Sequence, residues 1–196
     1  GLDFIKSIRF LALMFVLSRI SYIIFDFYYT KFDLSLYAQS PNYWYWKVAN
    51  LFVGLGIANL LRVLEKTVLN GKYKGAFVYY VLITTILVIV WPVNDLDDFK
   101  TISIFAVMTQ SGFLIFLVIF VNLAWKSTGK MRKVAITMII GGIFYALGSI
   151  FVLSNIIDYA NTIYGGNVDV YFYILQSVLK TIGLVLLTYA TRNFRL

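Results

Sequence analysis

The residues most able to do chemistry are two cations inside long apolar segments. Arg19 lies near the middle of the segment 8–28, and Lys180 lies near the middle of the segment 170–191. A charge at the centre of a bilayer costs at least about 2.5 kcal/mol, so such a residue usually faces the interior of a helix bundle and has a partner there. We therefore expect both cations to belong to a polar site.

Neutral polar residues accompany both cations at helical spacing. Tyr22 follows Arg19 by one turn and Gln176 precedes Lys180 by one turn, which places each pair on one helix face. Gln110 lies at comparable depth in the fourth apolar segment. These positions predict a polar pocket between the first, fourth and sixth segments. The candidate residues for binding a ligand or a partner are Arg19, Tyr22, Gln110, Gln176, Ser177, Lys180 and Thr181.

Three kinds of group can neutralise these cations. The first belongs to the chain itself, with Asp26 and Tyr22 beside Arg19 and backbone carbonyl groups beside Lys180. The second is an acidic residue in a transmembrane helix of a partner. The third is an anionic ligand such as a carboxylate, a phosphate or a lipid headgroup. None of the 9 acidic residues is expected at the depth of the two cations, so the sequence leaves all three alternatives open.

The composition argues against catalysis. The chain contains no histidine and no cysteine, which removes the commonest general base, the commonest haem ligand and the thiolate nucleophile. The sequence also lacks a zinc-protease HExxH motif and a pair of aspartates in the middle of apolar segments. We therefore expect no enzyme activity, no cofactor and no metal site.

Two charged connections contain partial motifs. The segment 126–133 includes a Thr-Gly-Lys triplet, but a phosphate-binding P-loop requires a glycine where Ala124 stands. Asp95, Asp97 and Asp98 form an acidic connection without the spaced oxygen ligands and the glycine of an EF-hand loop. We interpret the basic connection as a topology signal that also contacts anionic lipid, and the acidic connection as a solvated turn.

The elements that carry these residues are long enough to cross a membrane. Hydrophobic residues make up 61% of the 196 residues and charged residues only 13%, whereas soluble domains carry about 25% charged residues. Since about 20 apolar residues span a bilayer as a helix, the sequence predicts an all-α integral membrane protein with about six transmembrane helices in a single domain, residues 1–196. The predicted helices cover residues 8–28, 45–66, 75–92, 102–125, 134–156 and 170–191.

Lysines and arginines predict the orientation of these helices. Most of the 17 cations lie at segment ends that would share one side of the membrane, whereas the opposite connections are mainly acidic. Because positive residues accumulate on the cytoplasmic side, we predict that both termini are cytoplasmic and that the protein resides in the plasma (cytoplasmic) membrane. The net charge of +8 then reflects topology, and we expect no nucleic-acid partner.

Small residues predict where helices pack closely, because backbones can approach where side chains are absent or short. The candidate packing positions are Gly54, Gly141, Gly142, Ala146 and Gly148.

Two hypotheses about function follow. The first is a non-catalytic integral membrane subunit or input module that packs against partner transmembrane helices, or against copies of itself, in a larger complex. The second is a small-solute binding or transport component with a central cationic pocket for an anionic ligand. Transporters often contain interrupted helices at matching positions in two halves. The sequence lacks this feature, which favours the first hypothesis.

Overall fold

The computed structural model describes residues 2–151, 154–164 and 168–193. Helices make up 86% of the chain, and these three ranges contain no strand. An apolar chain in a bilayer must satisfy its backbone N–H and C=O groups internally, and a helix does so within one segment. The predicted all-helical architecture is confirmed.

Within the described residues, five helices are long and apolar enough to cross a membrane. Four of them lie in α1 (Leu2–Ile23) with its π-helical continuation η1 (Ile24–Thr30), α2 (Asn42–Thr67), α4 (Leu96–Lys126) and α7 (Val168–Asn193), and the fifth is the Gly129–Gly148 part of α5 (Gly129–Ile150). This result supports the prediction of a multi-pass helical membrane protein.

The third predicted crossing, residues 75–92, corresponds to a shorter helix. Helix α3 (Ala76–Val90) has 15 residues and is therefore about 22 Å long, compared with a hydrocarbon layer of about 30 Å. A sixth crossing at α3 stays a prediction.

The predicted continuous helix over 134–156 is wrong. Helix α5 ends at Ile150, and a separate helix, α6, covers Ser154–Tyr164. The sequence places Ser154 and Asn155 at the start of α6, and these residue types favour the beginning of a helix over its interior. The residues between the predicted helices 134–156 and 170–191 therefore belong in part to a helix of their own.

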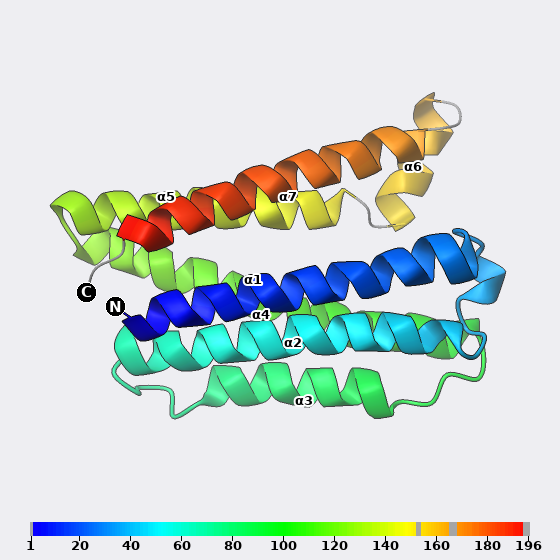
Figure 1. The fold of residues 1–196 in the computed structure, drawn as a ribbon, viewed down its shortest axis with the longest axis horizontal. Helices are drawn as coiled ribbons and strands as arrows, with labels where there is room; N and C mark the ends of the chain where they lie inside the picture. Colours follow the sequence, from blue (N-terminus) through cyan, green and yellow to red (C-terminus); the bar gives the residue numbers. More distant parts are fainter. Residues whose placement is uncertain (1, 152–153, 165–167, 194–196) are drawn as a thin grey trace. The chain divides into compact units, whose positions relative to one another are not determined.

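The helices group into two compact units, Gly1–Phe116 (unit 1) and Leu117–Leu196 (unit 2). In unit 1, α2 packs along both α1 and α3 (Figure 1). Two glycines of α2 permit these contacts: Gly54 lies against Thr85 of α3, and a Cβ atom on Gly56 would lie 3.0 Å from the Leu11 side chain of α1. Gly112 of α4 also lies against Ile57 of α2.

Aromatic side chains close one end of unit 1. Phe99 at the start of α4 stacks on Phe25 of η1, and their ring centroids are 6.2 Å apart. Tyr37, which follows the short helix η2 (Leu34–Leu36), contacts both rings edge-on. Trp46 of α2 lies 5.0 Å from Phe99. This cluster therefore joins the connection after η1 to the starts of α2 and α4.

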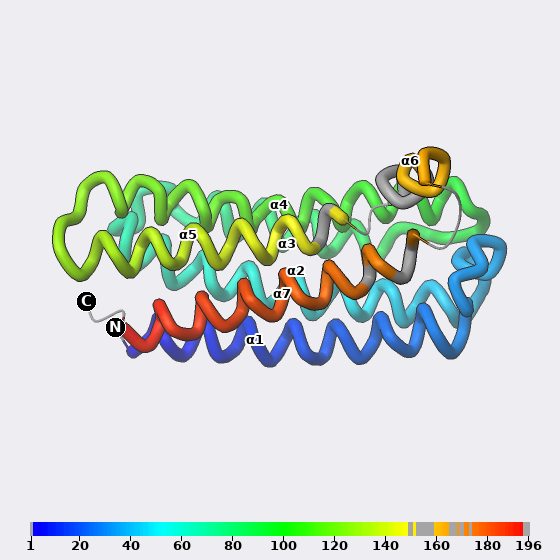
Figure 2. The backbone as a smooth tube through the Cα atoms, turned by 90° about the horizontal axis from the view of Figure 1, so that it is seen from above, coloured from blue at the N-terminus to red at the C-terminus, as the bar shows by residue number. Residues whose placement is uncertain are grey.

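In unit 2, α5 and α7 pack along each other in opposite directions (Figure 2). Gly141 and Gly183 meet at the crossing, where a Cβ atom on Gly183 would lie 2.7 Å from the Gly141 carbonyl oxygen. One to two turns away, a Cβ atom on Gly148 would lie 3.0 Å from the Gln176 carbonyl oxygen. The backbones of α5 and α7 can be this close only because these positions lack side chains.

Candidate functional site

Arg19 lies on the exposed face of α1. The side chains around it on this face are apolar and exposed, including Val16, Ile20 and Ile23. Asp26 attracts Arg19 electrostatically. Within the residues described, however, Arg19 makes no hydrogen bond or ion pair. Tyr22, which follows Arg19 by one turn, is half-buried. Unit 1 therefore presents a cation on an apolar helix surface.

Gln110 is exposed on α4, whereas its two polar neighbours contact α3. The Thr109 hydroxyl donates to Thr84 Oγ1 at 2.9 Å. The Ser111 and Tyr80 hydroxyls are also 2.9 Å apart. Within the polar triplet 109–111, the two outer hydroxyls therefore help to join α3 and α4, whereas Gln110 is exposed.

Lys180 lies at the contact between α5 and α7. Its Cγ atom would be 2.9 Å from a Cβ atom on Gly148, and its ammonium nitrogen lies 5.6 Å from the centre of the Tyr145 ring. This distance permits a cation–π interaction, which is stronger where water is excluded. Gln176, one turn earlier, is 3% exposed, and its Oε1 atom has no hydrogen-bond partner among the described residues. The buried Gln176 and the half-buried Lys180 therefore both lie against α5.

The other polar residues of α7 lie elsewhere on that helix. Ser177 and Thr181 are exposed, and the Thr181 hydroxyl donates to the Ser177 carbonyl at 2.8 Å. Together with Val178 and Ile182 they line a shallow groove of about 300 Å³. The four candidate binding residues of α7 are thus divided between the α5 contact and an exposed groove.

The seven candidate binding residues are divided between the two units. Arg19, Tyr22 and Gln110 lie in unit 1, whereas Gln176, Ser177, Lys180 and Thr181 lie in unit 2. A pocket that combines both cations stays a prediction.

The residues predicted to pack against other helices have low exposure. Gly54, Gly141, Gly142 and Gly148 are buried, and Ala146 is half-buried.

Sequence reasoning missed Lys47, which is only 2% exposed. Its ammonium group donates to the Trp91 carbonyl at 2.6 Å and to the Ile89 carbonyl at 3.1 Å, and it lies 4.9 Å from the centre of the Trp44 ring. The last carbonyl groups of a helix have no partner within that helix. Lys47 supplies donors for this end of α3.

Glu65 accepts a hydrogen bond at the start of α3, as Lys47 donates hydrogen bonds at its end. Its carboxylate accepts a hydrogen bond of 2.6 Å from the Gly75 N–H group and is 5% exposed. Gly75 precedes α3 with a φ of 83°, a left-handed conformation that glycine adopts without strain. The available signal in the sequence was an acidic residue shortly before a glycine-containing turn.

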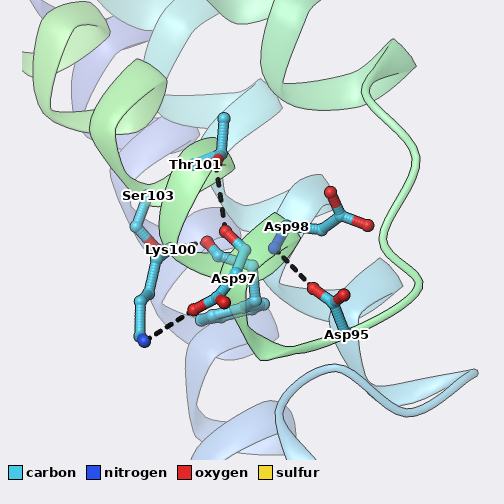
Figure 3. Close-up of polar contacts among 7 residues, drawn as sticks. Asp95, Asp97, Asp98, Lys100, Thr101 and Ser103 are labelled. Atoms are coloured by element: carbon cyan, nitrogen blue, oxygen red, sulfur yellow. Dashed lines mark hydrogen bonds and ion pairs between the residues drawn. The ribbon is translucent and has the colours of Figure 1, made fainter.

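The acidic connection before α4 consists of helix-capping interactions (Figure 3). Asp95 Oδ1 accepts from the Asp98 backbone N–H at 2.9 Å. Asp98 Oδ2 in turn accepts from the Asn94 backbone N–H. Asp97 forms an ion pair of 2.8 Å with Lys100. In the described part of the chain, no group of three histidine, cysteine, aspartate or glutamate residues has a geometry suited to a metal ion.

A further groove of about 260 Å³ lies in unit 2 between the end of α4 and the start of α5. It is lined by Val121, Ala124, Trp125, Arg132, Ile136 and Ile139.

Comparison with known proteins adds no family to these observations. No protein-family model, no curated protein and no solved structure matches this chain at a significant level.

Proposed function

We propose that this protein is a non-catalytic subunit of a membrane complex that binds a partner transmembrane helix along the exposed face of α1. The observation that carries the proposal is the position of Arg19 on that face without a hydrogen bond or ion pair to the described residues. A cation facing lipid at this depth costs at least about 2.5 kcal/mol. A partner carboxylate at the same depth removes this cost.

The acidic residues of the chain favour a separate partner. Unit 2 contains only Asp158 and Asp169, both near the ends of predicted membrane segments. Asp26 lies two turns from Arg19 and therefore about 10 Å along the helix axis. A second copy of the chain supplies the same 9 acidic residues, so self-association provides no additional carboxylate at the depth of Arg19. A different chain with an intramembrane acidic residue fits this face best.

The proposed topology has both termini in the cytoplasm and six crossings, including α3. The basic residues at the ends of α2, α4 and α7 support this orientation. The proposed location is the plasma (cytoplasmic) membrane.

The alternative function is a small-solute binding or transport component. One observation favours it: the unpaired Gln176 Oε1 atom lies in the same buried contact as Lys180. An unsatisfied buried acceptor costs about 1–3 kcal/mol. A solute that combines an anionic group with a hydrogen-bond donor would interact with both side chains.

Co-purification from native membranes in a mild detergent tests the proposed function. The wild-type protein should retain a partner chain whose transmembrane helix carries an acidic residue, and Arg19→Leu should release that chain while the protein stays folded. The matched control is Arg62→Leu, which removes an exposed cation near the other end of unit 1. Arg19→Glu combined with arginine at the partner's acidic position should restore binding.

Retention of the same partner by Arg19→Leu would overturn the proposed interface. A small anionic molecule in the purified wild-type protein, lost in Lys180→Met but kept in Arg19→Leu, would support the alternative function instead.

A further inference from the structure

The α4–α5 groove, defined by its lining residues Val121, Ala124, Trp125, Arg132, Ile136 and Ile139, combines an apolar interior with a cationic rim. Its volume of about 260 Å³ exceeds the roughly 150 Å³ of an apolar cavity that binds benzene. A stretch of acyl chain therefore fits inside it. All the lining residues belong to unit 2.

Arg132 is the cationic residue of the lining, and the chain segment around it carries further positive charge. The segment 117–150 contains no aspartate or glutamate. Its four cations are all exposed: Lys126, Lys130, Arg132 and Lys133. Helix α5 begins in this basic segment, and the Thr128 side chain does not cap its first turn, so the positive end of the helix dipole adds to the same field.

Trp125 indicates the depth of the groove in the membrane. It is the second-last residue of α4 and is 84% exposed, and tryptophan favours the boundary between the hydrocarbon layer and the headgroups. A groove at this boundary meets a lipid phosphate at its rim and an acyl chain in its interior. A free phosphate would leave the apolar walls unfilled, and a zwitterionic lipid would make less use of the four cations.

We propose that the α4–α5 groove is a binding site for one anionic phospholipid, with the phosphate beside Arg132 and an acyl chain along Ala124 and Ile136. This site is independent of Arg19 and of the partner proposed for α1. It identifies a lipid ligand that the protein would select from the surrounding bilayer.

Fluorescence quenching by brominated lipid tests this site in the full chain. Trp44→Phe, Trp46→Phe and Trp91→Phe leave Trp125 as the single tryptophan. This variant is reconstituted in phosphatidylcholine vesicles that contain a fixed minor fraction of phosphatidylglycerol. The bromines are carried either by the phosphatidylglycerol or by an equal fraction of the phosphatidylcholine. Brominated phosphatidylglycerol should quench Trp125 more strongly.

Two variants test separately the charge of Arg132 and the apolar interior of the groove. Arg132→Gln should lower the preference for phosphatidylglycerol about fivefold, which corresponds to the loss of one cation near the surface. The exposed Arg62→Gln at the end of α2, outside the groove, is the matched control and should keep the preference. Ala124→Leu fills the groove while preserving all four cations, and it should also reduce quenching by phosphatidylglycerol.

Equal quenching by both brominated lipids in the single-tryptophan protein would show ordinary boundary lipid and overturn the site. Absence of quenching by either lipid would show that protein covers the groove and would overturn it as well. If Ala124→Leu kept the full preference for phosphatidylglycerol, with unchanged thermal unfolding, the preference would arise from attraction to the basic surface alone. This result would exclude a lipid inside the groove.

Discussion

Lys47 and Glu65 lie on the same helix, α2, and bind opposite ends of the same neighbour, α3. The Lys47 ammonium group donates to the carbonyl groups of Ile89 and Trp91, and the Glu65 carboxylate accepts from the N–H group of Gly75. Each charge therefore complements the helix dipole of α3 at the end where it lies. This arrangement holds a short helix in register with a longer one.

Replacing Lys47 with methionine should destabilise the protein by about 1.5 to 3 kcal/mol, the usual contribution of hydrogen bonds to charged groups. Methionine keeps most of the length of the side chain but leaves the last carbonyl groups of α3 without these donors. Unfolding in mixed detergent micelles, followed by circular dichroism, measures the change. Lys100→Met, which removes a cation from an exposed ion pair, should change the stability little. An equal effect of both substitutions would contradict the assigned role.

Glu65→Ala should be more destabilising than Glu65→Gln. Glutamine can still accept the hydrogen bond from Gly75 and loses only the charge, whereas alanine leaves the half-buried Gly75 N–H group without this acceptor. A hydrogen bond of this kind contributes about 0.5 to 1.5 kcal/mol. Hydrogen exchange at the Gly75 amide provides a local measurement. Unchanged amide protection in Glu65→Ala would refute the proposed bond.

Gly183→Ala should destabilise the α5–α7 pair by about 1 to 3 kcal/mol. The added Cβ atom would lie 2.7 Å from the Gly141 carbonyl oxygen and 2.8 Å from the Tyr145 backbone nitrogen, and neither backbone atom can rotate away. Ser177→Thr adds one methyl group to the exposed side of the same helix and serves as the control. Similar unfolding midpoints for the two variants would place Gly183 outside a tight contact.

Asp33 should titrate below its usual range, because the Ser35 hydroxyl and backbone N–H groups donate to its carboxylate and lower its pKa. A pKa lowered in the folded state stabilises this turn above the usual carboxyl pKa, and the stabilisation is lost as the pH falls through the lowered pKa. A carbon-detected NMR titration measures the midpoint. Ser35→Ala should raise the midpoint, and no shift would exclude the hydroxyl as a donor.

The proposed topology predicts opposite labelling of Asp97→Cys and Lys130→Cys. The chain has no cysteine of its own, so each single cysteine reports on one position. In right-side-out vesicles, a membrane-impermeant thiol reagent should label position 97 but not position 130. Labelling of both positions from one side would eliminate a crossing between them.

The amino-acid sequence by itself was enough to predict that the helices lie in a lipid bilayer and approximately how many there are. Continuous apolar segments can satisfy their backbone only as helices in a bilayer, so α1, α2, α4, α5 and α7 could be predicted from length and composition. The predicted depth of Arg19 and of Lys180 in the membrane rests on counting residues along these segments. The division at Ile150 was missed because the apolar residues continue beyond it.

Only the tertiary structure decided which way each residue faces. A membrane helix is apolar on nearly all sides, so it lacks the contrast between polar and apolar faces that identifies the buried side of a soluble helix. Sequence spacing could therefore not distinguish the exposed Arg19 from Lys180 beside Tyr145. The roles of Lys47 and Gly183 depend on which atoms a neighbouring helix places opposite them, and this information arises only when the helices pack.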